Sequence, residues 1–154
     1  MSWRGSCWGF GLAALALVAC APGTDPFLPD PTIASTPEMD IIRIVDGDTV
    51  EVLLRETGDS TNVRLVGYDT PETFRPGCAA ERALGEEAKL VLGRALEAAG
   101  EVDLDTQGTD KYRRLLGEIT LDGAPLAQVM VQAGVAVPYD GGRRINWCER
   151  LATG

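Results

Sequence analysis

The alternation of hydrophobic and polar positions after residue 40 predicts three consecutive β-strands. Residues 41–46 (IIRIVD) and 49–54 (TVEVLL) are rich in β-branched side chains and are separated by the turn sequence Asp46-Gly47-Asp48, which favours a hairpin. A second turn at residues 56–61 leads to a third segment of this kind, residues 62–68 (NVRLVGY). We expect these three strands to form a meander.

The hydrophobic period then lengthens from two residues to between three and four, which predicts a helix. Its apolar positions recur at spacings of four, four, three, four and four and so share one helical face: Ala80, Leu84, Ala88, Val91, Ala95 and Ala99. The acidic residues of this segment lie mostly off that face, and we expect them to be solvated: Glu81, Glu86, Glu87 and Glu97. Gly100 is expected to end the helix.

Two more strands and a second helix follow. Residues 101–106 (EVDLDT) and 115–121 (LLGEITL) read as strands with a loop at 107–111, and residues 124–133 form a short helix that Gly134 caps. Three strands, a helix, two strands and a helix are compatible with a small Greek-key barrel. We therefore predict an α+β fold, a five-stranded OB-fold β-barrel with two packed helices.

Composition narrows the chemistry that such a domain can perform. The chain has 154 residues, of which 45% are hydrophobic and 24% charged, as in a single globular domain with a real core. It contains no histidine, so mechanisms that need an imidazole base or ligand are excluded. The net charge of −9 argues against binding long nucleic acids by bulk electrostatics, although a local basic cleft could still hold a polyanion.

The N-terminal residues predict export. One arginine precedes the apolar run at residues 10–19 (FGLAALALVA), which is too short to span a bilayer and is typical of a signal peptide. Leu17-Val18-Ala19-Cys20 resembles the lipobox of bacterial lipoproteins, in which the cysteine is lipid-modified and anchors the chain to a membrane. The alternative is ordinary signal cleavage with Cys20 incidental.

A proline-rich segment separates the predicted signal peptide from the folded domain. Five of the nine prolines fall within residues 21–40, which predicts a stiff, extended tether. The expected organisation is a lipoprotein signal peptide at 1–19, a tether at 20–39 and a folded domain at 40–154. Such a chain would be an exported, membrane-anchored lipoprotein at the cell surface or in the periplasm.

The folded domain retains two cysteines, Cys78 and Cys148. In an exported chain a disulfide is their favoured use, and a bridge across 70 positions would stabilise the fold by about 4 kcal/mol in the chain-entropy model. Two free buried thiols are the alternative.

Three segments attract notice as carriers of chemistry: residues 45–50 (VDGDTV), 64–73 (RLVGYDTPET) and 109–115 (TDKYRRL). Each has a simpler interpretation when taken alone. The first can be only a hairpin turn, and the third only a solvated basic loop. The second can start a helix, with Thr70 as the cap, Pro71 in the first helical position and Glu72 in the first turn.

Taken together and in this order, the DGDT, R-x4-DTPE and DKY-x-R patterns resemble the staphylococcal nuclease family over about residues 40–138. The resemblance implies a calcium site formed by the carboxylates of Asp48 and Asp69 and the backbone carbonyl of Thr70. It also implies Glu72 as the proposed general base. The two phosphate-binding arginines would be Arg64 and Arg114.

The same resemblance assigns further roles. Lys111 and Tyr112 would lie near a terminal phosphate, Tyr139 near the base-stacking tyrosine, and Asp46 behind the metal ligands. Arg113 stands where the family usually has glycine. The segment from Tyr139 to Cys148 resembles a shorter bacterial branch of the same family, in which a cysteine holds the C-terminus in place.

These roles agree with elementary chemistry. Calcium prefers oxygen ligands in flexible geometry, which two aspartates and a carbonyl supply without histidine. Two guanidiniums can stabilise the charge that develops as water attacks phosphorus, and Glu72 can accept the proton of that water. The sequence thus predicts a monomeric, calcium-dependent nuclease that acts on DNA or RNA, with no protein partner.

Two other interpretations remain at this point. A non-catalytic OB-fold lipoprotein could bind a ligand or partner at the cell surface. A structural lipoprotein could use its calcium site only to stabilise the fold.

Overall fold

The predicted hairpin is formed by β1 (Met39–Asp46) and β2 (Thr49–Leu54), which pair antiparallel. A computed structural model gives the structure and describes residues 38–153. The predicted signal peptide, Cys20 and nearly all of the tether lie outside the described residues.

The predicted third strand divides into two that pair with different partners. β3 (Ser60–Leu65) runs antiparallel to β2 and parallel to β6 (Leu115–Leu121). β4 (Gly67–Asp69) pairs instead with β8 (Val137–Tyr139). The prediction of one continuous strand was wrong because the chain turns at Gly67, whose φ of 89° few other residues adopt.

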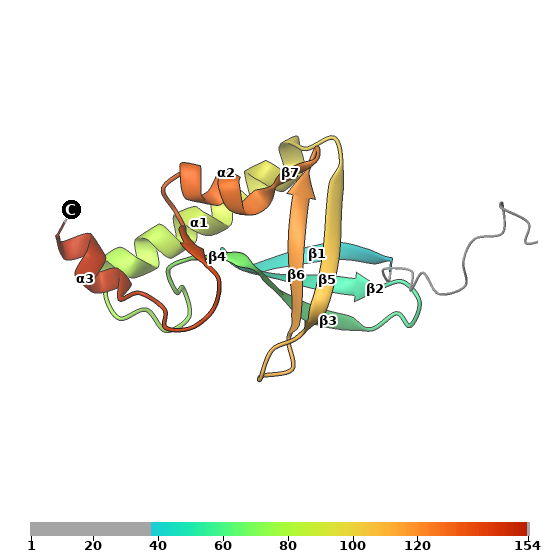
Figure 1. Ribbon diagram of the computed structural model, residues 1–154, viewed down its shortest axis with the longest axis horizontal. Coiled ribbons are helices and arrows are strands. Elements are labelled where there is room, and N and C mark those ends of the chain that lie inside the picture. Colours follow the sequence, from blue (N-terminus) through green and yellow to red (C-terminus); the bar gives the residue numbers. More distant parts are fainter. Residues whose placement is uncertain (1–37, 154) are drawn as a thin grey trace, which may run out of the picture. The chain divides into compact units, whose positions relative to one another are not determined.

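The main sheet has the order β1-β2-β3-β6-β5 (Figure 1), with β5 (Val102–Thr109) antiparallel to β6. A two-residue strand, β7 (Ala124–Pro125), adds to β6. The order confirms the α+β, OB-fold-like barrel. The loop predicted from residue 107 starts later, since β5 continues through an irregularity in its pairing to Thr109.

The long helix, α1 (Ala79–Ala98), buries Ala88 and Leu92 as part of the barrel core. Two details of its predicted faces were wrong: Ala80 is exposed, and Glu81 is buried. Glu81 is buried because its carboxylate accepts hydrogen bonds from the backbone N–H of Gly77 at 2.6 Å and of Glu72 at 3.4 Å. It therefore ties down the loop that precedes the helix.

The second helix, α2 (Leu126–Gln132), starts two residues later than predicted because β7 takes the first positions. Gly134 has the positive φ expected of its capping role. A third helix, α3 (Trp147–Ala152), was not predicted. The Asn146 side chain caps it by accepting hydrogen bonds from the N–H groups of residues 148 and 149.

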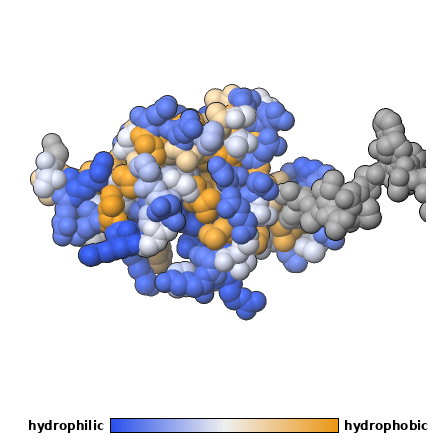
Figure 2. All heavy atoms as spheres, viewed as in Figure 1, coloured by the Kyte–Doolittle hydropathy of each residue, from blue (hydrophilic) through white to orange (hydrophobic). Residues whose placement is uncertain are grey.

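The core lies between the barrel strands and helices α1 and α2, and its largest fully buried side chains are Tyr68, Leu65, Leu92, Ile119, Leu126 and Met130. On the face shown in Figure 2, hydrophobic residues form separate patches among hydrophilic ones. Within residues 38–153, no helix is long and apolar enough to cross a membrane.

Candidate active site

Asp48 is positioned by a tight contact between the β1–β2 turn and α1. A Cβ atom at Gly47 would lie 2.7 Å from the Cβ of Ala88, so only glycine fits there. The Tyr68 hydroxyl donates to the Gly47 carbonyl at 3.1 Å and also holds the turn in place. The Asp48 side chain is consequently held in the protein interior.

Asp69 and Thr70 arrive at the same place from the end of β4. The backbone N–H of Thr70 donates to Asp48 Oδ2 at 3.4 Å, and the Trp147 indole donates to Asp69 Oδ2 at 3.3 Å. Burial raises the pKa of Asp69 above its ordinary value, and the positive charge of Arg144 opposes this shift only in part. A cation beside a buried carboxylate of this kind stabilises its charged form.

Arg64 supplies one such cation from β3. Its guanidinium forms ion pairs with Asp48 and, at 3.1 Å, with Asp69 Oδ1. The Arg64 side chain is only 11% exposed, so these pairs are little screened by solvent.

Glu72 lies in the loop between β4 and α1. A Cβ atom at Gly85 would lie 2.8 Å from the Thr73 side chain and 2.9 Å from the Pro71 carbonyl, so glycine lets this loop rest on the helix. Because α1 begins only at Ala79, the interpretation of the Asp-Thr-Pro-Glu sequence as a helix start was wrong. The loop instead carries the Glu72 carboxylate to the buried aspartates.

Asp46 supports this loop from behind. Its carboxylate accepts hydrogen bonds from the Thr73 hydroxyl at 3.2 Å and from the Gly47 N–H at 3.1 Å. Burial, and after it the charge of Asp48, raise the pKa of Asp46. Asp46 thus links the β1–β2 turn to the loop that carries Glu72.

Arg144 completes the cluster, and the sequence interpretation missed it. Its Nε lies 2.6 Å from Asp69 Oδ1 and its Nη2 lies 3.0 Å from the Thr70 carbonyl. It also forms an ion pair with Glu72 and a longer one, 3.7 Å, with Asp48. Although burial opposes its charged form, the three carboxylates raise the pKa of Arg144 above the usual value.

A disulfide holds the segment that carries Arg144 against the site. It joins Cys78 to Cys148, whose Cα atoms lie 5.9 Å apart. The chain between β8 and α3 thus runs beside the loop that follows β4 (Figure 1). The disulfide was expected from the sequence. Because Cys78 follows Glu72 by only six positions, the bridge was the available signal that a basic residue near Cys148 would reach the cluster.

A cleft of about 1170 Å³ opens beside the cluster and gathers the remaining predicted residues. Its lining contains four cationic side chains, Arg64, Lys111, Arg114 and Arg144, and the aromatic side chains of Tyr112 and Tyr139. Three acidic residues, Asp110, Glu118 and Asp140, also line it. The charged side chains of the cleft thus carry a small net positive charge on an otherwise acidic chain.

Arg114 lines the cleft without touching the buried carboxylates. It pairs with Asp110 at 2.8 Å, and its own N–H also donates to that carboxylate at 2.9 Å. Desolvation alone would raise the pKa of Asp110, but the hydrogen bonds from Arg114 and from the Tyr112 N–H lower it. Asp110 thus fixes the loop and the direction of the Arg114 side chain.

Arg113, in the same loop, has a φ of 68°. This left-handed conformation costs most residues roughly 1–2 kcal/mol, whereas glycine adopts it freely. The backbone therefore explains why a glycine suits this position. Here the loop retains the conformation with an arginine.

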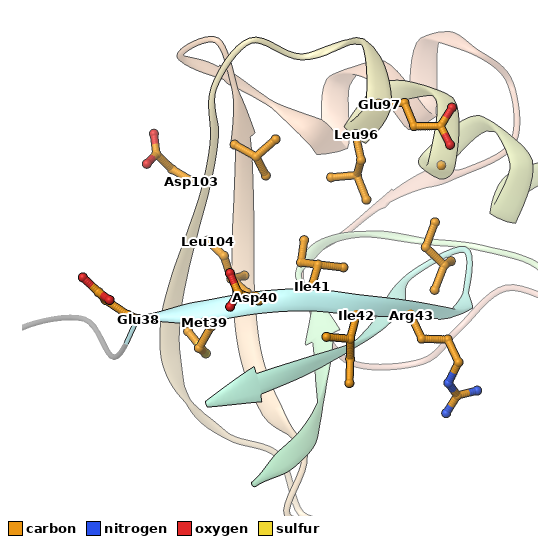
Figure 3. A pocket seen from close by; sticks show the side chains of 13 residues that line it. Glu38, Met39, Asp40, Ile41, Ile42, Arg43, Leu96, Glu97, Asp103 and Leu104 are labelled. Atoms are coloured by element: carbon orange, nitrogen blue, oxygen red, sulfur yellow. The ribbon is translucent and has the colours of Figure 1, made fainter. Parts of the chain in front are cut away.

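A second groove, of about 680 Å³, lies between β1, β5 and α1 (Figure 3). Its charged lining consists of four acidic residues and one cation: Glu38, Asp40, Glu97, Asp103 and Arg43. Ile41 and Leu96 supply apolar side chains. This groove is unsuited to phosphate, so the basic cleft is the better candidate.

The cluster fits a hard cation such as calcium. Oxygen atoms of Asp48, Asp69, Thr70 and Glu72 all converge on a single cationic group, the Arg144 guanidinium. The Thr70 hydroxyl is also buried and has no hydrogen-bond partner within the described part of the chain. Carboxylate and carbonyl oxygens are the ligands that calcium prefers.

Comparison with known families agrees with this geometry. Residues 62–147, more than half of the chain, match the family described as staphylococcal nuclease homologue. The chain belongs to this family. The match contains both halves of the cleft, from Arg64 to Arg144, whereas Asp46 and Asp48 lie outside it, before its first residue.

Two similar proteins carry nuclease names. The chain is 31% identical over 97 residues to the thermonuclease of Staphylococcus hyicus and 32% identical over 97 residues to endonuclease YncB of Bacillus subtilis. These alignments cover 62% and 61% of this chain but 56% and 44% of the relatives. The chain thus spans about half the length of these two relatives.

Proposed function

We propose that this chain is a calcium-dependent phosphodiesterase that hydrolyses DNA, RNA or both. One observation carries the proposal: four oxygen donors converge on one cationic position at the edge of a cleft with basic and aromatic lining. The names of the similar proteins support a nuclease. Calcium is favoured over zinc because the donor set contains oxygen and no nitrogen.

The metal site in this proposal consists of Asp48, Asp69 and the carbonyl of Thr70. Calcium bound there would polarise a phosphoryl oxygen of the substrate. Arg64 and Arg114 line the cleft and would bind the other phosphate oxygens, with the strongest contact as negative charge builds up at phosphorus. Asp46 and Glu81 keep the loop of Glu72 in place.

Glu72 would accept the proton of the attacking water. Its side chain is 39% exposed, so water reaches it, while its backbone N–H is held by a buried carboxylate. A positioned carboxylate of this kind contributes a rate factor of about 10²–10⁴. No covalent intermediate with the chain is needed.

The substrate would extend along the aromatic side of the cleft. Tyr112 is 69% exposed, and the ammonium group of Lys111 lies 5.0 Å from the centre of its ring. This pair offers a charge for a terminal phosphate and a ring for a base. The Tyr139 hydroxyl donates to the Gly142 carbonyl at 2.8 Å, which holds its ring at the cleft for stacking.

Removal of the metal tests the proposal. The purified full-length chain with calcium should cleave single-stranded DNA or RNA, chelator should stop the cleavage, and added calcium should restore it. A Glu72→Gln variant purified in the same way serves as the control for contaminating nucleases. If both substrates stay intact with calcium while the protein is folded, the chain is a binding or structural domain and not a nuclease.

We also propose that Cys20 is lipid-modified and anchors the chain to a membrane. The support is the sequence Leu17–Cys20 and the proline-rich segment after it. Metabolic labelling with a radioactive fatty acid, compared with a Cys20→Ser variant, tests this directly.

A further inference from the structure

Arg144 contacts every oxygen donor of the proposed metal site. It lies 2.6 Å from Asp69 Oδ1, 3.0 Å from the Thr70 carbonyl and 3.7 Å from Asp48 Oδ2. The same guanidinium pairs with Glu72, the proposed proton acceptor. A divalent cation held by these oxygens would need the space that the guanidinium fills.

The charges show why the cluster needs a cation in that space. Asp48, Asp69 and Glu72 contribute three negative charges, and Asp69 is only 1% exposed. Arg64 offers one compensating charge from the side of β3. Without a second cation the cluster would hold uncompensated buried charge, which is strongly destabilising.

The Arg144 side chain is placed so that it can leave the cluster. It is 40% exposed, and residues 140–146 on the same segment are all exposed. The segment is attached at both ends, by the pairing of β8 with β4 and by the disulfide at Cys148. Arg144 also lines the basic cleft, so its guanidinium can turn into the cleft without movement of these attachments.

We propose that the Arg144 guanidinium and the metal ion are alternative occupants of the oxygen cluster, so that Arg144 sets the calcium affinity of the site. This inference rests on the proposed function. In the metal-free protein, the Arg144 guanidinium compensates the negative charge of the carboxylates and forms an ion pair with Glu72. When calcium binds, the guanidinium is displaced toward the cleft, and Glu72 becomes available to accept a proton.

Calcium titrations of matched arginine variants test the inference. Calorimetric titration with CaCl₂ compares the wild type, Arg144→Ala and the control Arg143→Ala, whose side chain is exposed and forms no ion pair within residues 38–153. Arg144→Ala should bind calcium about tenfold or more tightly, as expected if the guanidinium occupies the cluster in about nine molecules out of ten. Arg143→Ala should bind like the wild type.

Thermal unfolding of the same variants supplies a second readout. In chelator, Arg144→Ala should melt below the wild type, because its carboxylates lack a cation. Saturating calcium should raise its melting temperature by more than that of the wild type. A guanidinium that merely braces the site would predict the opposite: weaker calcium binding in Arg144→Ala and a smaller calcium-induced rise.

Equal or weaker calcium binding by Arg144→Ala overturns the inference. If wild type and variant both fail to bind calcium, the proposed metal site fails with it. A chain that binds calcium as expected but cleaves no nucleic acid contradicts only the proposed function. If Arg144→Ala does not fold, the NMR signal of the Arg144 side-chain Nε–H in the wild type supplies the test. The signal is assigned by its loss in Arg144→Lys. If this Nε–H stays protected from solvent exchange at saturating calcium, the inference is overturned.

Discussion

Replacement of Glu72 by glutamine should reduce the rate of phosphodiester cleavage by about 10²–10⁴, the contribution expected of a general base. Glutamine keeps the size of the side chain and an oxygen that can accept from Arg144, but it cannot take a proton from water. The half-exposed position of Glu72 predicts little change in the free energy of unfolding. Single-turnover cleavage rates and urea unfolding measure the two effects.

Glu86→Gln is the matched control for this variant. Glu86 is exposed on α1 and forms no ion pair or side-chain hydrogen bond within residues 38–153. It should keep wild-type rate and stability. A Glu72→Gln variant that retains the wild-type rate would remove Glu72 from the chemistry.

Replacement of Arg64 by alanine should abolish cleavage and also weaken the fold. Arg64 is 11% exposed and forms ion pairs with two buried aspartates, so its loss should lower the free energy of unfolding by about 3–5 kcal/mol. Since the substrate phosphate also loses a guanidinium, the rate should fall even in molecules that remain folded. Urea unfolding and cleavage assays below the unfolding transition separate the two effects.

Arg114→Ala provides the comparison within the same cleft. Arg114 is 38% exposed and pairs with Asp110, and exposed pairs of this kind contribute about 0–1 kcal/mol. This variant should lose turnover with little loss of stability. Equal losses of stability in Arg64→Ala and Arg114→Ala would contradict the burial-based distinction between the two arginines.

Local patterns predicted most of the barrel. The hairpin at Gly47, the strand of residues 115–121 and the long helix all follow from hydrophobic periodicity and turn residues. The carboxylates could be assigned to one site because the three motifs, taken together, resemble the staphylococcal nuclease family. The resemblance was visible because each motif lies within a short segment of the chain.

The errors lie where distant segments meet. Glu81 looks like a surface residue of a helix, and only the loop folded against it explains its burial. Arg144 looks like half of a solvated Arg-Arg pair until the disulfide brings it to Glu72. The division into β3 and β4 depends on β8, a partner about 70 residues away in the chain.

The short third helix had a local signal that was overlooked. Asn146 precedes it, and Glu149 stands in its first turn, a combination typical of helix starts. Its length of six residues is below what hydrophobic periodicity can reveal. Capping residues would have been the better guide there.

The most direct test of a catalytic metal site in the cluster is the calcium dependence of cleavage by Asp48→Asn. Asparagine keeps the shape of the side chain but removes one charge from the ligands, so calcium affinity should fall. The calcium concentration for half-maximal rate should rise about tenfold or more, a loss of at least about 1.4 kcal/mol of binding free energy. Excess calcium should then restore much of the rate. An unchanged half-maximal calcium concentration, with the variant folded and active, would contradict the assignment of Asp48 as a ligand of the catalytic ion.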